Sequence, residues 1–243
     1  MGLVMNNVDV KVGNIRVGCF SSINDLISNS IYTGDGIKPG FAIAINPEKV
    51  IAVNQSPELS MLIESASIRY PDGVGVSYVM SKKTRNNIPR IPGCELWESL
   101  MLYSASFDTP VFLLGANSQV SKHTSDKLVS LGVNVVGSHD GFFDNEETII
   151  NAITSSKAKI VTVAMGSPRQ EQFINKCRKS YPDAFYMGVG GTYDVYTGVV
   201  KRAPSMFCKL HLEWLYRLLQ QPSRIFRQTN LLKFLLLYIS GRL

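Results

Sequence analysis

Two glycine-bearing turns in the second half of the chain have the residue types of a site for a phosphate-bearing ligand. The first turn, Gly166–Glu171, follows the apolar run Ile160–Met165, and the second, Gly188–Asp194, follows Phe185–Met187. A β-branched run that ends in Gly-Ser-Pro is typical of a buried strand that turns directly into a helix. The first N–H groups of such a helix lie at the positive end of its dipole without partners in the helix, so they suit phosphate oxygens.

Three residues of the first turn have the types expected where a helix begins. Ser167 is predicted to be the N-cap, Pro168 the first helical residue, and Gln170 the partner of the cap in a capping box. The glycines of the second turn, at positions 188, 190 and 191, would let its backbone approach the same ligand closely. Both features also have a purely structural interpretation, as a helix cap and a tight turn. Their spacing is not the Gly-x-Gly-x-x-Gly pattern of dinucleotide-binding folds.

The elements that must position these turns alternate regularly before residue 200. Seven apolar runs are predicted to be strands: Arg16–Phe20, Phe41–Ile45, Ile68–Tyr70, Val111–Leu114, Asn134–Val136, Ile160–Ala164 and Phe185–Met187. Seven segments are predicted to be helices: Ile23–Ile31, Pro57–Ser65, Gly75–Lys82, Glu95–Ser106, Ser118–Ser130, Glu146–Ser155 and Pro168–Lys179. We therefore expect an α/β fold with a Rossmann-like, mainly parallel sheet flanked by helices, in a catalytic domain of residues 1–200.

In such a sheet, ligands bind beyond the carboxyl ends of the strands. Besides the two turns, the segments expected there are Asn46-Pro47, Pro71-Asp72-Gly73, Gly115-Ala116-Asn117 and Asp140-Gly141-Phe142. We expect all of them to converge on one cleft. Asp72 is the most interesting residue, because the turn Pro-Asp-Gly-Val-Gly would expose its carboxylate after a strand. Pro-Asp-Gly is also an ordinary turn sequence, so a structural role is the alternative.

Composition narrows the class of protein. The chain has 243 residues, of which 45% are hydrophobic, enough for one large domain with an appendage. Its four cysteines and three histidines lack the spacing of metal ligands, and no Asp-x-Asp pair is present, so no metal site is predicted. The amino terminus lacks the pattern of a secretory signal, and no stretch of about 20 uncharged apolar residues indicates a membrane span.

The net charge of +6 is distributed unevenly along the chain. Residues 201–243 contain eight Lys or Arg residues and one acid, a charge of +7, so the first 200 residues, with 17 bases and 18 acids, carry −1. A nucleic-acid enzyme more often spreads positive charge over its main domain, so nucleic acid is not an expected partner.

The basic tail, residues 201–243, is predicted to be a helical membrane-binding appendage. Pro222 divides it into two helices, with leucines at helical spacing in each. Basic residues beside leucine, tryptophan and phenylalanine suit helices that lie in the interface of an anionic bilayer. The alternative is an amphipathic pair that packs on the core or on another subunit of a homo-oligomer.

Seven ordered blocks extend over nearly the whole chain: Asn46-Pro-Glu-Lys, Pro71-Asp-Gly-Val-Gly-Val, Arg90-x-x-Gly93, Ala164-Met-Gly-Ser-Pro-Arg-Gln-Glu171, Gly188-Val-Gly-Gly-Thr-Tyr-Asp194, Gly198-x-Val-Lys-Arg-Ala-Pro204 and Glu213-Trp-Leu-Tyr-Arg-Leu-Leu-x-Gln-Pro-Ser-Arg224. Through these blocks the chain resembles the WecG/TagA/CpsF family of bacterial glycosyltransferases. The tail and the segment Val163–Pro168 look most like the branch of the family that acts in enterobacterial common antigen synthesis.

The resemblance implies an inverting, metal-independent hexosyltransferase that needs no cofactor. Its donor would be UDP-N-acetyl-D-mannosaminuronic acid (UDP-ManNAcA), and its acceptor N-acetylglucosamine on undecaprenyl diphosphate. The enzyme would be cytoplasmic and peripheral on the inner face of the plasma membrane. The teichoic-acid branch carries threonine where this chain has Ala44. A hydroxyl contact is therefore lost, and the identity of the donor sugar stays open. The alternative is transfer from UDP-ManNAc in a related surface-polymer pathway.

The resemblance also implies roles for individual residues. Asp72 matches the family's proposed base, which removes the acceptor's hydroxyl proton while UDP leaves from the opposite face. Arg90 matches a polar residue of the same cleft and is expected to be catalytic, because a guanidinium binds diphosphate oxygens in pairs. The residues expected to bind substrate are Asn46, Ser167, Arg169, Gln170, Gly190, Gly191, Thr192, Asp194, Arg217 and Arg224. The partner of a donor carboxylate is expected among Arg169, Lys201 and Arg202.

Two other classes of function stay open from the residues alone. A dinucleotide-dependent oxidoreductase would use a similar sheet, although the Gly-x-Gly-x-x-Gly pattern and the acid about 20 residues beyond it are missing. A non-enzymatic membrane-surface module would bind lipid and use the glycine turns only for structure. A transferase should be stabilised against heat by UDP rather than by NAD.

Overall fold

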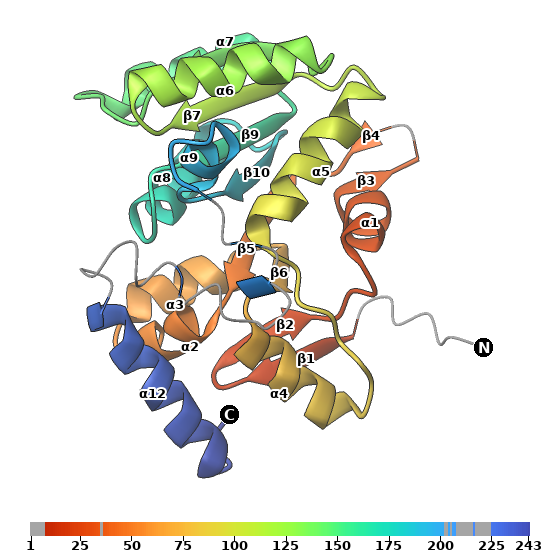
Figure 1. The fold of residues 1–243 in the computed structure, drawn as a ribbon. Helices are drawn as coiled ribbons and strands as arrows, with labels where there is room; N and C mark the ends of the chain where they lie inside the picture. The colour runs from red at the N-terminus through yellow and green to blue at the C-terminus, as the bar shows by residue number, and fades with distance from the viewer. Residues whose placement is uncertain (1–7, 35, 202–203, 205, 208–215, 217–224) are drawn as a thin grey trace.

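The central element of the fold is a six-stranded sheet in which all neighbouring strands are parallel (Figure 1). The computed structural model describes residues 8–34, 36–201, 204, 206–207, 216 and 225–243. The strand order is β6-β5-β10-β9-β7-β8, with bounds Gly40–Ile45 (β5), Ile68–Pro71 (β6), Val111–Gly115 (β7), Val135–His139 (β8), Ile160–Ala164 (β9) and Phe185–Gly188 (β10). The predicted α/β, Rossmann-like architecture is confirmed.

Helices cover both faces of the sheet, and each face has its own hydrophobic core. The first core includes α2 (Pro47–Ala52), α3 (Pro57–Glu64), α4 (Val74–Thr84), α7 (Glu146–Ser156) and α8 (Arg169–Ser180). The second includes α1 (Ile23–Leu26), the π-helix η1 (Ile27–Ile31), α5 (Gly93–Ala105), α6 (Ser118–Ser130) and α9 (Thr192–Tyr196).

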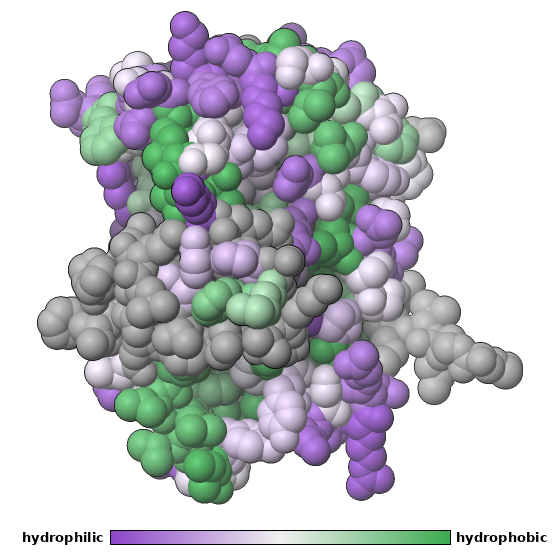
Figure 2. Space-filling view, viewed as in Figure 1, coloured by the Kyte–Doolittle hydropathy of each residue, from purple (hydrophilic) through white to green (hydrophobic). Residues whose placement is uncertain are grey.

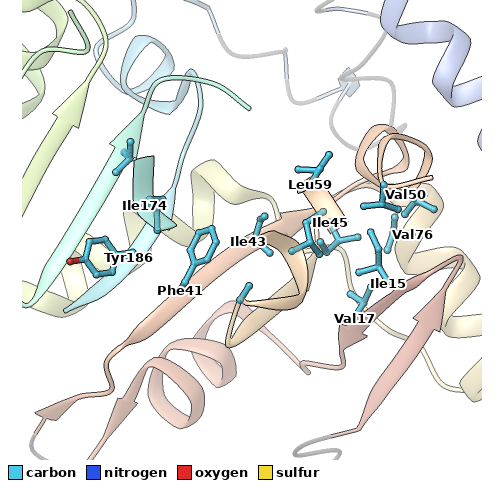
Figure 3. Packing of buried hydrophobic residues seen from close by; sticks show 14 of the residues in the cluster. Ile15, Val17, Phe41, Ile43, Ile45, Val50, Leu59, Val76, Ile174 and Tyr186 are labelled. Atoms are coloured by element: carbon cyan, nitrogen blue, oxygen red, sulfur yellow. The ribbon is translucent and has the colours of Figure 1, made fainter. Parts of the chain in front are cut away.

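Strand β5 shows how one strand serves both cores. Phe41, Ile43 and Ile45 enter the first core (Figure 3). Ala42, on the opposite side of the pleat, enters the second core. Such a strand reads as a continuous apolar run because both of its faces are covered. The same cause explains why β7 and β9, which are buried along their whole length, were predicted closely from sequence.

Six of the seven predicted strands form this sheet, and the seventh does not. The run predicted as Arg16–Phe20 is β2 (Ile15–Gly18), which pairs in antiparallel fashion with β1 (Asp9–Val12) in a separate hairpin. The hairpin alternates buried and exposed residues, so it covers the first core with one face only. A second short pair, β3 (Tyr32–Thr33) with β4 (Gly36–Ile37), was not predicted, and neither were α2 and α9.

The carboxyl-terminal helix α12 (Ile225–Ile239) confirms the second predicted helix of the tail. It packs on α2, and its Phe234 is buried in the first core. The first predicted tail helix, with Pro222, lies outside the described residues, and the domain boundary at residue 200 stays a prediction. No helix in the described ranges is both long and apolar enough to cross a membrane.

Candidate active site

A cavity of about 790 Å³ lies at the carboxyl edge of the sheet. Most of its lining comes from the ends of four adjacent strands, β6, β5, β10 and β9, and from the segments that follow them. Asn230 of α12 also lines the cavity. Parallel α/β sheets bind ligands at this edge, and the volume falls within the range of roughly 300–1,000 Å³ that small-molecule sites occupy. The two glycine-bearing turns therefore do meet at one cavity, as the sequence predicted.

Asp72 and Arg90 lie together on the β6 side of this cavity. The Asp72 backbone N–H donates to the Ile45 carbonyl at 2.8 Å, which fixes the end of β6 against the end of β5. Its Oδ1 is 3.6 Å from Arg90 Nε, and the two side chains keep 27% and 21% of their surface exposed. Its Oδ2 accepts a hydrogen bond of 3.4 Å from the backbone N–H of Gly93 at the start of α5. The carboxylate is thus held in place but still open to the cavity.

Asn46 also lines the cavity, and it has a structural task as well. It is the N-cap of α2, and its Oδ1 accepts a hydrogen bond of 2.9 Å from the Lys49 backbone N–H. The cap holds the first turn of α2 directly behind the end of β5. A cavity-lining side chain whose oxygen is already used in this way is rigid, because a second rotamer would break the cap.

The predicted capping box at Ser167 and Gln170 is wrong. Helix α8 begins at Arg169, Pro168 occupies the N-cap position, and no side chain caps this end of the helix. The reason is the turn at Gly166, with φ of 76°, whose carbonyl accepts the Gln170 backbone N–H at 2.9 Å. Ser167 lies in this turn, and the Ser167–Pro168 peptide bond is cis. Ser167 therefore lines the cavity and does not cap the helix.

The Gln170 side chain joins the two glycine-bearing turns. It is buried, and its Oε1 accepts a hydrogen bond of 2.9 Å from the Gly190 backbone N–H, while its Nε2 donates to Glu171 Oε1 at 3.2 Å. A Cβ on Gly188 would lie only 2.6 Å from Gln170 Nε2, so glycine is needed for this close approach. Gly190 itself has φ of 55°, a left-handed conformation that glycine adopts without strain.

Aromatic side chains of the second core anchor the segment after Gly190 on the side away from the cavity. Gly191, Thr192 and Asp194 all line the cavity at the start of α9. Tyr193 points away into the second core, where its hydroxyl lies 2.6 Å from Thr162 Oγ1 and its ring 5.4 Å from that of Trp97. Burial raises the pKa of the Asp194 carboxyl above its ordinary value.

Arg169 and the two loops on the β7–β8 side do not line the cavity. The Arg169 guanidinium donates to the Gly141 carbonyl at 3.0 Å and lies 5.5 Å from the centre of the Phe143 ring. The segments 115–117 and 140–142 follow β7 and β8, the two strands of the sheet that lie next to β9 and away from the cavity. The predicted convergence of all six segments on one cleft is therefore only partly correct. Arg202, Arg217 and Arg224 lie outside the described residues, whereas Lys201 lines the cavity.

A buried ion pair that was not predicted from the sequence joins Lys49, which lines the cavity, to Glu171. Lys49 Nζ lies 2.8 Å from Glu171 Oε1, with 10% and 0% of the two side chains exposed. Glu171 falls among the buried positions of α8, beside Gln170 and Ile174. A charged residue on the buried side of an amphipathic helix is the signal that would have found it, because such residues are rarely buried without a partner.

The model of the glycosyl transferase WecG/TagA/CpsF family matches residues 10–243 of the chain. The match includes every segment that lines the cavity. The chain belongs to this family. It is therefore a hexosyltransferase, and members of the WecG/TagA/CpsF family use a nucleotide-sugar donor and a lipid-linked acceptor. Within the described ranges, no group of three or more His, Cys, Asp or Glu side chains is placed to hold a metal ion.

A first prediction concerns the close approach at Gly188. Gly188→Ala should weaken binding of the donor's nucleotide about fivefold, because the new Cβ must displace the Gln170 amide from Gly190, and one hydrogen bond is worth roughly 1 kcal/mol. Isothermal titration calorimetry with UDP measures the change. Gly36→Ala in β4 is the matched control, since no atom lies within 4 Å of the position of its Cβ. Unchanged UDP affinity in Gly188→Ala would show that the Gln170 contact is irrelevant to the donor.

Proposed function

We propose that this glycosyltransferase moves N-acetyl-D-mannosaminuronic acid from UDP-ManNAcA to N-acetylglucosamine on undecaprenyl diphosphate, with inversion and without a metal ion. The observation that carries the proposal is the pairing of Asp72 with Arg90 in a cavity that also contains both glycine-bearing turns. The sugars are proposed from the resemblance of Val163–Pro168 and of the tail to the branch that acts in enterobacterial common antigen synthesis.

The proposed chemistry is a single displacement. The Asp72 carboxylate accepts the proton of an acceptor hydroxyl while the oxygen of that hydroxyl bonds to the anomeric carbon of the donor sugar. The bond from that carbon to the UDP oxygen breaks on the opposite face, and UDP leaves with the electron pair. Arg90, with a fork of N–H donors beside the carboxylate, suits the phosphate oxygens of donor or acceptor.

The diphosphate of the donor is proposed to lie between the starts of α8 and α9. Ser167 and Gly191 line the cavity there, and within the described residues neither the Ser167 hydroxyl nor the Gly191 N–H has a hydrogen-bond partner. The Gly190 N–H is already bonded to Gln170, so it would support the turn instead of binding phosphate. Positive charge is supplied by Lys201, an exposed residue of the lining that also suits the carboxylate of a ManNAcA donor.

A donor panel tests the choice of substrates. The enzyme is incubated with one of three donors, UDP-ManNAcA, UDP-ManNAc or UDP-N-acetylglucosamine. The acceptor is a short-chain lipid-diphosphate N-acetylglucosamine, and the products are identified by mass spectrometry. UDP-ManNAcA should give the largest yield, and Lys201→Met should reduce the preference for the carboxylate-bearing donor. Equal or better transfer from UDP-ManNAc would move the protein to the related surface-polymer pathway.

Asp72→Asn tests the base. The substitution should lower turnover by about 10²- to 10⁴-fold, the usual contribution of a positioned base, and should leave UDP affinity within about twofold. Asp108→Asn is the matched control, because Asp108 lies outside the cavity and its φ of 48° suits asparagine. If Asp72→Asn were merely less stable, with normal turnover per folded molecule, Asp72 would be a turn residue and not the base.

Peripheral binding to an anionic membrane is proposed for the face of α12 that turns away from α2. Hydrophobic side chains gather over α12 at the lower left of Figure 2, and the exposed ones are Leu232, Leu235, Leu236 and Ile239. They recur at helical spacing on one face, while Phe234 on the other is buried. Lys233 and Arg242 are exposed beside them, as expected of a helix lying in an anionic interface.

Liposome flotation tests the membrane proposal. Leu235→Asp/Leu236→Asp should reduce binding to anionic liposomes at least tenfold, because each leucine contributes roughly 1.5–3 kcal/mol when it leaves water. Val129→Asp/Leu131→Asp is the control, since these exposed apolar residues belong to α6 and its end. Undiminished flotation would contradict the proposal. If Leu235→Asp/Leu236→Asp changed the oligomeric state and left flotation unchanged, α12 would contact a second subunit.

A further inference from the structure

The buried ion pair Lys49–Glu171 belongs to a continuous chain of polar contacts that ends at the backbone of the second glycine-bearing turn. Lys49 Nζ bonds to Glu171 Oε1 at 2.8 Å, and the same oxygen accepts from Gln170 Nε2 at 3.2 Å. Gln170 Oε1 then accepts from Gly190 N–H at 2.9 Å. These polar contacts therefore connect α2, α8 and the turn after β10, which follow three adjacent strands of the sheet.

The charge of Glu171 favours one of the two orientations of the Gln170 amide. A primary amide has one end that donates and one that accepts, and the two ends have almost the same shape. An ionised carboxylate only accepts, so it selects the NH₂ end of Gln170 and leaves the oxygen to face the Gly190 N–H. Burial raises the pKa of the Glu171 carboxyl, but the Lys49 ammonium and the hydrogen bonds outweigh burial and hold that pKa below its ordinary value.

The same orientation matters for the shape of the cavity. Lys49, Gln170, Gly188 and Gly190 all line it, whereas Glu171 lies outside the lining and is completely buried. With the amide reversed, its NH₂ would face the Gly190 N–H, and two donors would oppose each other. The turn would then have to move, and with it the neighbouring Gly191 backbone.

We propose that Lys49 and Glu171 are positioning residues, which fix the Gln170 amide and through it hold the Gly188–Gly191 turn in the form that receives the donor's diphosphate. This inference rests on the proposed function for the identity of the ligand, but not for the chain of contacts. A buried ion pair is a poor device for stability, since apolar residues of similar volume often replace one without loss. Its use in this site is the orientation of a neighbour.

The double variant Lys49→Met/Glu171→Met separates positioning from stability. It removes both charges together, so it leaves no unpaired ion in the interior and should keep a melting temperature close to that of the native protein. Two quantities are then measured: the affinity for UDP by calorimetry, and the rate of amide hydrogen exchange at Gly190 by NMR. We expect UDP affinity to fall about fivefold and Gly190 to exchange about fivefold faster, which is the effect of losing one hydrogen bond.

The surface ion pair of α7 and α8 provides the matched control. Lys176 Nζ lies 2.6 Å from Glu146 Oε2, and both side chains are well exposed and away from the cavity. Lys176→Met/Glu146→Met removes the same charges and should change neither measurement. If Lys49→Met/Glu171→Met, folded and stable, bound UDP as tightly as the native protein and protected Gly190 equally, the pair would be merely structural and the inference wrong.

A conservative variant covers the case in which the double variant does not fold. Glu171→Asp keeps the charge but withdraws the carboxylate from Gln170 by one methylene, so Gly190 should again exchange faster and UDP bind more weakly. Unchanged exchange at Gly190 in this variant overturns the inference. If the native protein bound no UDP, the proposed function would fail, whereas exchange at Gly190 would still decide whether Lys49 and Glu171 hold the turn.

Discussion

The insertion of β10 between β5 and β9 is the interaction on which the rest of the structure depends. This strand is the last of the sheet along the chain, yet it pairs in parallel with both neighbours at the centre. Phe185, Tyr186 and Met187 are all buried, and they contribute to both cores. Without β10 the sheet would separate into β6-β5 and β9-β7-β8. The turn that follows β10 consequently lies in the middle of the carboxyl edge, between the ends of β5 and β9.

That position divides the cavity into two chemically different sides. On the β6 side, Asp72 and Arg90 place a carboxylate next to a guanidinium, an arrangement suited to moving a proton beside an anionic substrate. On the β9 and β10 side, the two glycine-bearing turns line the cavity, and the Gln170 amide bonds one turn to the other. An inverting displacement needs a base and a leaving group on opposite faces of one sugar. This division suits the inverting displacement that we propose.

The fold could be predicted from the sequence where burial is uniform. The strands β7, β9 and β10 are continuous apolar runs with a glycine at or near the end, and their predicted bounds differ little from those observed. The prediction for β8 ended three residues early, at Val136 in place of His139, because this edge strand is half exposed and its last residues are Gly-Ser-His. The order of the strands depends on pairing between distant segments, which local patterns do not contain.

The site could be predicted only in part, because some of its contacts join residues that are distant in the sequence. The turn at Asp72 has a local signature, but its pairing with Arg90 depends on how the chain returns to β6. Ser167 has the type of an N-cap, yet the turn at Gly166 displaced it. Lys49 and Glu171 are 122 positions apart, so only the charge of Glu171 on a buried helix face hinted at a partner.

We propose that the carboxyl edge over β5, β10 and β9 receives the nucleotide of the sugar donor. A crystal structure of the protein with UDP tests it most directly. We expect the diphosphate between Ser167 and Gly191, with Gln170 still bonded to the Gly190 N–H beneath it. A diphosphate bound beside segments 115–117 and 140–142, or anywhere outside the cavity, would contradict it.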